Sequence, residues 1–255
     1  MGIHSKTVAI FTIIFLAMVV SYTAVATPKY EYKGVHFTQL SENVWMHTSY
    51  KNIPNWGNVL TNGLIIINEK NTTLIDTAWD NTQTLAILEW VHKQLKTPIT
   101  QAVFTHAHQD KMGGVDAIKA QGIATYAHPL SNKIAPTKGL SPAENNLSFN
   151  TSGESYEISP LIIYYPGPGH TGDNITVAIP EKGIVFAGCL LRPAKSVNLG
   201  NTADADLSEW ESSVIKLKNR FPNAGIIIPS HGEPSGRNLF SNTSKLAHEH
   251  SHNHE

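Results

Sequence analysis

Six side chains of the types that bind transition metals stand where predicted strands end. His106, His108 and Asp110 crowd one short turn, directly after a strand predicted over 100–105. The others, His170, Cys189 and His231, each follow a later predicted strand. Imidazole, thiolate and carboxylate are the ligands that zinc prefers, and loops at strand ends commonly hold active sites. The set divides into two groups of three, which would leave coordination positions open for water.

Each of these residues has an ordinary explanation when it is taken alone. A single histidine is more often a capping or surface residue, and a single cysteine is more often a small buried apolar group. The repetition of ligand types after successive strands favours a metal centre. Cys189 is the only cysteine of the 255 residues, so an internal disulfide is excluded. A bound metal would also protect its thiol from oxidation.

The pattern of apolar residues predicts strands and helices around these loops. Strands are expected over 35–40, 43–46, 63–67, 73–77, 100–105 and 123–127, and near Ile162, Ile175, Ile184 and Ile226; helices are expected over 81–96, 114–121 and 207–221, and after Ser235. Two clusters of strands, each followed by helices, indicate an α/β fold of two packed sheets with helices outside. A three-layer α/β fold remains open. Residues 145–155 are expected to form a flexible loop.

The N-terminal segment has the three parts of a secretory signal peptide. Lys6 precedes an apolar run over 8–20, and Ala24-Val25-Ala26 gives the small-x-small pattern of a cleavage site. The apolar run is shorter than the roughly 20 residues that a spanning helix needs. We therefore expect residues 1–26 to be removed, the mature protein to reach the periplasm without a membrane anchor, and 27–247 to form one domain. Residues 248–255 would be a histidine-rich tail.

Charge and composition limit the class of partner. Hydrophobic residues make up 41% of the chain, enough for a large core. Removing the single charge of Lys6 takes the net charge from −1 to −2. This balance gives no reason to expect nucleic acid, and it favours a small-molecule substrate.

Four motifs carry a resemblance to a known family. They are THAHQDKMGG at 105–114, PGPGHTGDN at 166–174, FAGC at 186–189 and PSHG at 229–232. Together they resemble the metallo-β-lactamases of class B, subclass 1, over essentially the whole mature chain, and the tract 105–126 is most similar to the New Delhi-type enzymes. Many other hydrolases of this superfamily have histidine where this chain has Lys111 and aspartate where it has Cys189.

The resemblance implies an αββα four-layer sandwich and two zinc ions. His106, His108 and His170 would bind the first zinc, and Asp110, Cys189 and His231 the second. A zinc-bound hydroxide oriented by Asp110 would open the β-lactam amide of penicillins, cephalosporins and, on the family pattern, carbapenems, which confers antibiotic resistance. Members are usually monomeric.

Other residues match family positions that contact substrate or support the metal loops. Arg192 stands where many members bind the substrate carboxylate with lysine, and Lys195 could reach the same anion. Asn201 would help to orient the carbonyl, or is only a turn residue. Trp56 resembles part of a flexible flap, or is a packed tryptophan in a hairpin. Asp76 matches an aspartate that supports the metal loops, whereas nearby Asp80 could serve a helix N-terminus.

Two rival functions use the same residues differently. Another hydrolase of this fold, such as a thioesterase or lactonase, could apply the same metal chemistry to other acyl groups. A zinc-binding envelope protein is suggested by export and by histidines at every second position over 248–254. Such a tail could form a weak auxiliary zinc site if it were ordered.

Overall fold

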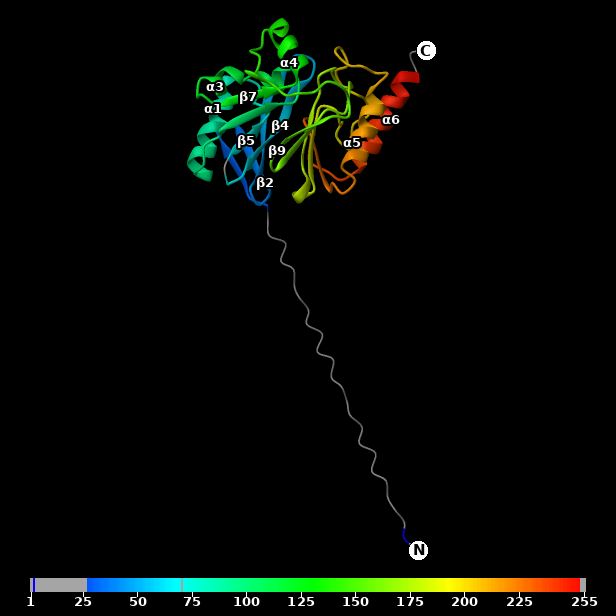
Figure 1. The fold of residues 1–255 in the computed structure, drawn as a ribbon, viewed down its shortest axis with the longest axis horizontal. Helices are drawn as coiled ribbons and strands as arrows, with labels where there is room; N and C mark the ends of the chain where they lie inside the picture. The colour runs from blue at the N-terminus through cyan, green and yellow to red at the C-terminus, as the bar shows by residue number, and fades with distance from the viewer. Residues whose placement is uncertain (1, 3–26, 70, 253–255) are drawn as a thin grey trace.

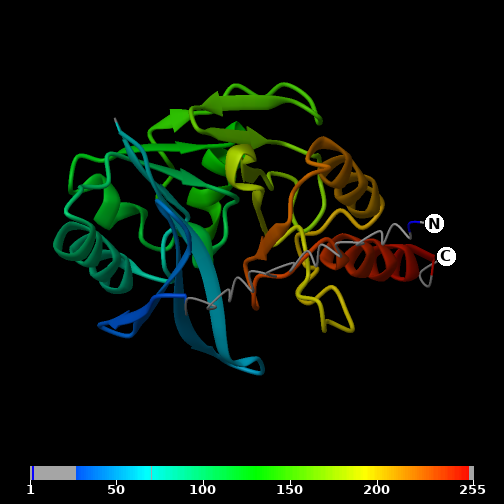
Figure 2. The same cartoon turned by 90° about the horizontal axis from the view of Figure 1, so that it is seen from below.

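Two β-sheets lie face to face at the centre of the molecule, and helices cover the outer face of each (Figures 1 and 2). The structure is a computed structural model that describes residues 2, 27–69 and 71–252. Helices α1 and α3 lie against the first sheet, while α5 and α6 lie against the second (Figure 1). This is the αββα arrangement, so the α/β prediction is confirmed and the three-layer alternative is excluded.

In the described residues the first sheet has eight strands, which are neighbours in chain order. They are β1 (Lys29–Tyr32), β2 (Val35–Ser41), β3 (Val44–Ile53), β4 (Gly57–Ile67), β5 (Thr72–Ile75), β6 (Gln101–Phe104), β7 (Ala124–Ala127) and β8 (Asn145–Asn146). Strands β1 to β5 pair antiparallel, and β5 to β8 pair parallel. Parallel pairing needs crossover connections, which here contain the helices.

The second sheet has the order β13-β12-β11-β10-β9. Its strands are β9 (Ser155–Ile158), β10 (Leu161–Tyr164), β11 (Thr176–Ile179), β12 (Ile184–Gly188) and β13 (Ile226–Pro229). Only the β12–β13 pair is parallel. The connection between those two strands contains α5, so the loops that follow β12 and β13 emerge at the same edge of the sheet.

The helices of the described chain lie between the strands and at its C-terminal end. They are α1 (Asn81–Trp90), which continues as the π-helical turn η1 (Val91–Leu95), α2 (Gln109–Met112), α3 (Val115–Lys119), α4 (Pro129–Ile134), η2 (Ala135–Lys138), η3 (Pro180–Lys182), α5 (Trp210–Arg220) and α6 (Asn238–His252). Asp80 is the N-cap of α1, because its carboxylate accepts a hydrogen bond of 2.8 Å from the Gln83 amide.

Both faces of the central strands are buried, which explains their continuous apolar runs. Leu64 faces the core between the sheets, whereas its neighbour Ile65 packs under the helices of the first sheet. On β12, Phe186 enters the same central core and Val185 packs beneath α5 and α6. Alternating side chains thus fill three apolar layers, as a four-layer sandwich requires.

Parts of the described chain differ from the sequence predictions. Residues 145–155 are not one flexible loop: β8 and β9 occupy its ends, and Leu147 and Phe149 are buried between the sheets, since apolar side chains anchor it. The strand predicted over 73–77 ends at Ile75, because Asp76 has a left-handed backbone with φ 60°.

The boundary predicted between residues 247 and 248 falls inside α6, which runs unbroken to His252. His248 Nδ1 lies 3.1 Å from Glu211 Oε2 of α5, a contact that holds this end of the helix. Residues two apart on a helix point in nearly opposite directions, so His248 and His250 do not converge on one metal as an alternating tail would.

The predicted signal peptide, residues 1–26, lies outside the described residues apart from Gly2. Among the helices that the structure describes, none combines the length and the apolar composition that a membrane span requires.

His47 on β3 should make folding stability sensitive to pH. The side chain is fully buried, with Nε2 3.3 Å from the Ile75 carbonyl oxygen, and burial lowers its pKa from 6.5 to about 3. The contribution of neutral His47 to the free energy of unfolding is therefore fully present above pH 6.5 and is lost as the pH falls towards 3. Between these pH values the unfolded chain binds a proton at this histidine and the folded chain does not. In urea unfolding across this range, His47→Gln should reduce the pH slope by up to about 1.4 kcal/mol per pH unit. Equal slopes would contradict this assignment.

Candidate metal centre

The six predicted ligands meet where the strand ends of both sheets face each other. His106, His108 and Asp110 follow β6 in the first sheet. His170 lies between β10 and β11, Cys189 directly follows β12, and His231 is the second residue after β13. Their ligand atoms form two groups of three, each with all atoms within 4.8 Å of one another: His106, His108 and His170 in one, and Asp110, Cys189 and His231 in the other.

The three-histidine group presents converging ring nitrogens. His108 Nδ1 lies 3.1 Å from His106 Nε2 and 3.2 Å from His170 Nε2. His106 is fully buried, and burial, followed by the neighbouring imidazoles, holds its pKa well below the ordinary value. A neutral imidazole has the lone pair that a metal needs, so this donor set fits a zinc ion.

The second group combines three ligand chemistries. Asp110 Oδ2 is 3.9 Å from Cys189 Sγ and 3.5 Å from His231 Nε2, and the sulfur is 3.5 Å from the same nitrogen. His231 Nδ1 donates a 2.7 Å hydrogen bond to the Leu60 carbonyl, which leaves Nε2 as the unprotonated nitrogen. The pKa of His231 is lowered, and burial is the main cause. Carboxylate, thiolate and imidazole around one point also fit zinc.

Lys111 supports this second group from inside the protein. Its side chain is fully buried, with Nζ 3.3 Å from Asp110 Oδ2 and 3.6 Å from Asp76 Oδ2. The ammonium also donates to Thr61 Oγ1 at 2.6 Å and to the Asn62 carbonyl at 3.0 Å. Sequence analysis treated Lys111 only as a residue that distinguishes this family. Its position in the turn 106–111, called the ligand turn below, could have indicated a role beside the ligands.

The charges of this cluster stabilise one another. Burial alone would lower the pKa of Lys111, but Asp110 and Asp76 outweigh it and raise that pKa. Burial opposes ionisation of Asp110, yet Lys111 and then His231 bring its pKa below the ordinary value. Asp110 is therefore a carboxylate that faces the other ligands as an anion.

Asp76 joins the ends of β5 and β6. Its carboxylate accepts a 2.7 Å hydrogen bond from the Thr105 amide and a 2.9 Å bond from the Thr105 hydroxyl. Thr105 Oγ1 in turn lies 3.3 Å from His106 Nδ1. Burial raises the pKa of Asp76 to about 7, against the opposing charge of Lys111. The structure thus gives Asp76 the supporting position that the sequence suggested.

Two further supports, Asp173 and Asp204, were missed because the residues that they contact lie far from them in sequence. Asp173 is buried and accepts hydrogen bonds from the Ala107 amide at 2.8 Å and from Ser131 Oγ at 2.7 Å, which holds the ligand turn against α4. Asp204 Oδ2 is 2.8 Å from His108 Nε2 and 2.7 Å from Lys138 Nζ. Lys138, and then His108, lower the pKa of Asp204 to about 2.

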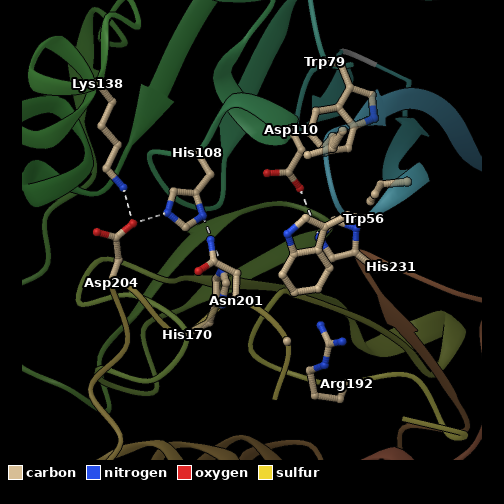
Figure 3. Close-up of a pocket in the computed structure, with 13 residues that line it drawn as sticks. Trp56, Trp79, His108, Asp110, Lys138, His170, Arg192, Asn201, Asp204 and His231 are labelled. Atoms are coloured by element: carbon tan, nitrogen blue, oxygen red, sulfur yellow. Dashed lines mark hydrogen bonds and ion pairs between the residues drawn. The ribbon is translucent and has the colours of Figure 1, made fainter. Parts of the chain in front are cut away.

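A cavity of about 470 Å³ opens over both groups (Figure 3). Its lining includes an apolar wall of Ile53, Trp56, Val59 and Trp79. Trp56 lies at the β3–β4 hairpin and is 60% exposed, so it is not a packed structural tryptophan.

Two of the remaining predicted substrate contacts also line the cavity, Arg192 and Asn201, whereas Lys195 is not among its described lining residues. Arg192 Nε donates to the Asn198 carbonyl at 3.3 Å, and burial lowers its pKa. Asn201 Oδ1 accepts from the Ala203 amide at 3.1 Å, which is a turn interaction. The structure thus shows the turn contact of Asn201, while its role towards a substrate carbonyl stays a prediction.

Comparison with known proteins agrees with this geometry. Residues 56–231 match the profile of the metallo-beta-lactamase superfamily. The metallo-beta-lactamase type 2 of Bacteroides fragilis is 34% identical over 212 residues, which is 83% of this chain and 85% of that protein. The corresponding enzyme of Bacillus cereus is 34% identical over 218 residues, covering 86% and 84% of the two chains.

Among solved structures, the metallo-beta-lactamase FIM-1 of Pseudomonas aeruginosa, in a mono-zinc form, superposes with a TM-score of 0.82 at 54% identity. The alignment covers 85% of this chain and 96% of FIM-1. A metallo-beta-lactamase of Erythrobacter litoralis gives a TM-score of 0.84 at 45% identity, covering 87% and 100%. The resemblance found in the motifs is confirmed, and the chain belongs to the metallo-β-lactamase superfamily.

Proposed function

We propose that this chain, a zinc-dependent β-lactam hydrolase, holds two zinc ions side by side at the base of its cavity. His106, His108 and His170 would bind the first, and Asp110, Cys189 and His231 the second. The observation that carries the proposal is the convergence of two complete three-ligand groups beneath one cavity. When bound, zinc would supply Lewis acidity at the substrate carbonyl and lower the pKa of water to about 7.

The residues of the cavity would bind and orient the substrate. The apolar wall that includes Trp56 and Trp79 suits the hydrophobic substituents of a β-lactam, while Arg192 on the cavity lining can grip the carboxylate beside the ring nitrogen. Because Asn201 Oδ1 is engaged by Ala203, its amide NH₂ group is the donor available to the substrate carbonyl.

Asp110 would act on the attacking water. Its carboxylate, which the buried Lys111 keeps ionised, can accept a hydrogen bond from that water and align it with the carbonyl carbon. Attack would form a bond between the water oxygen and the carbonyl carbon and break the amide C–N bond. The attacking water would release its proton to solvent, and the ring nitrogen would take a proton from solvent. The exposed cavity admits that solvent, so a separate general acid is not required.

We extend the proposal to substrate range and location. Penicillins, cephalosporins and carbapenems share the ring amide and carboxylate that this site would recognise, so hydrolysis would confer resistance to them. Cleavage after Ala26 and a periplasmic location are proposed from the signal pattern of the sequence, and a monomeric state is proposed from the family resemblance. The relatives reported above are named β-lactamases, so a thioesterase, a lactonase and a zinc-binding envelope protein are not proposed.

Loss of the thiolate should remove the second zinc. Cys189→Ser replaces a soft anionic ligand with a hydroxyl, so we expect zinc content to fall from two to one per chain. Hydrolysis of a chromogenic cephalosporin should fall by at least the roughly 10–100-fold typical of lesser changes around a metal. Metal analysis and initial rates measure both effects.

The control for this experiment is wild-type protein treated with a chelator and then given zinc again. Its activity should disappear and return. Activity that survives chelation, or a wild-type chain that takes up only one zinc at saturation, would contradict the two-zinc proposal.

Arg192 and Lys195 form a matched pair for testing the carboxylate contact. Arg192→Ala should raise KM for a cephalosporin by roughly 10–100-fold, since a charge-assisted hydrogen bond is worth about 1.5–3 kcal/mol. Lys195→Ala should change KM little, because Lys195 does not line the described cavity. With the methyl ester of the same substrate, the difference between the two variants should vanish. A larger effect at Lys195 would transfer the role to it.

Removing the buried ammonium should destabilise the fold. Lys111→Met leaves Asp76 and Asp110 without their shared cation, and breaking a buried pair typically costs about 3–5 kcal/mol. Urea unfolding should show this loss. The double variant Lys111→Met/Asp76→Asn should recover part of it, because one buried carboxylate is then gone. A single variant as stable as wild type would refute this account of Lys111.

A further inference from the structure

Asp204 and Lys138 form a charged contact at the outer side of the first metal group. Asp204 Oδ2 lies 2.8 Å from His108 Nε2 and accepts a hydrogen bond of 2.7 Å from Lys138 Nζ (Figure 3). The His108 nitrogen on the other side of the ring, Nδ1, points to His106 and His170. The two ring nitrogens therefore have separate partners, and a ring that donates from Nε2 keeps its Nδ1 lone pair for a metal.

The two residues come from opposite halves of the sandwich. Lys138 is the last residue of η2, which follows α4 beside the first sheet, whereas Asp204 lies in the loop between β12 and α5 of the second. The same loop carries Asn201. The contact between Lys138 and Asp204 thus joins the two halves at one side of the cavity, and both side chains line it.

Each end of the contact has a fixed base. The segment that carries Lys138 is tied to the ligand turn through Asp173, which binds both Ser131 of α4 and the Ala107 amide. The segment around Asp204 is tied to the His170 loop, because the Asp206 amide donates to the Gly169 carbonyl at 2.8 Å. The backbone on both sides is therefore held independently of the charged contact.

The Asp204 side chain itself is less constrained. It is 45% exposed, whereas the His108 side chain is 17% exposed. An exposed carboxylate can turn into water, and a single histidine donor gives little resistance to that motion. Lys138, with 28% of its side chain exposed, supplies a second donor and a positive charge to the same oxygen.

We propose that Lys138 is a positioning residue that acts through Asp204 to hold His108 in the orientation that binds the first zinc. Lys138 keeps the Asp204 carboxylate over the cavity, and Asp204 accepts the Nε2 hydrogen of His108, so Nδ1 stays directed at the metal. This inference rests on the proposed role of His108 as a zinc ligand.

The test measures zinc affinity by competition with a chromogenic chelator, using the full chain. Asp204→Ala should weaken zinc binding at the first group by about 10–100-fold, as loss of an outer partner of a metal ligand does. Lys138→Met should weaken it by a smaller factor, roughly 3–10-fold, and Lys138→Arg should restore it because arginine keeps the charge. Lys133→Met, an exposed lysine in neighbouring α4, is the matched control and should bind zinc like wild type.

The double variant shows whether Lys138 works through Asp204. In the Asp204→Ala background, Lys138→Met should cause no further loss, since groups that act as one unit are not additive. When Co²⁺ replaces zinc, the Cys189 thiolate gives an absorption band with the bound ion, and this band reports on the second group alone. The band should be unchanged in the Lys138 and Asp204 variants. Equal losses from Lys138→Met in both backgrounds, or wild-type affinity in Lys138→Met, would overturn the proposal.

His108→Ala in the same assay separates this inference from the proposed function. If that variant binds the first zinc like wild type, the proposed ligand set fails and the role of Lys138 fails with it. If it loses the first zinc while Asp204→Ala and Lys138→Met retain wild-type affinity, only the role of Asp204 and Lys138 is refuted.

Discussion

A buried ammonium group between two carboxylates is the constraint on which the metal centre depends. Lys111 Nζ lies between Asp76 and Asp110 with no exposed side-chain surface. Removing such ionisable groups from water is costly unless each finds close partners. The cluster satisfies that requirement only if the loops after β5 and β6 adopt one geometry, so the charge pairing and the loop conformation impose each other.

The same cluster reaches the second sheet. Lys111 donates to the carbonyl of Asn62 on β4, and the Asn62 side chain donates to the carbonyls of Pro229 and Gly232 on either side of His231. The Asn62 backbone N–H also donates a hydrogen bond of 2.8 Å to the Ser230 carbonyl. Ligand loops from both halves of the chain are thus joined through one polar network, in which a buried group without a partner would be destabilising.

The two metal groups differ in how their surroundings hold them. The Asp110, Cys189 and His231 group sits on buried charge, with Lys111 behind it, and therefore depends on the interior of the fold. The three-histidine group has Asp76 behind Thr105 on one side, but on the other its partner is the half-exposed Asp204. One group is consequently supported by the core and the other in part by a contact between the two halves at one side of the cavity.

The sequence by itself determined the α/β class, the approximate strand ends and the ligand-type residues at them. The reason is that the spacing of apolar residues and the chemistry of each side chain can be read from neighbouring positions. It identified Arg192 and Trp56 as candidates for the cavity, and both line it. It did not show that the Lys111 side chain is buried, or that Lys195 is absent from the described cavity lining. Nor did it show that Asp204 contacts Lys138, which is 66 residues away in the sequence. Those outcomes depend on which loops the packed sheets bring together, and contacts between residues so distant in the chain leave no periodic signal in the sequence.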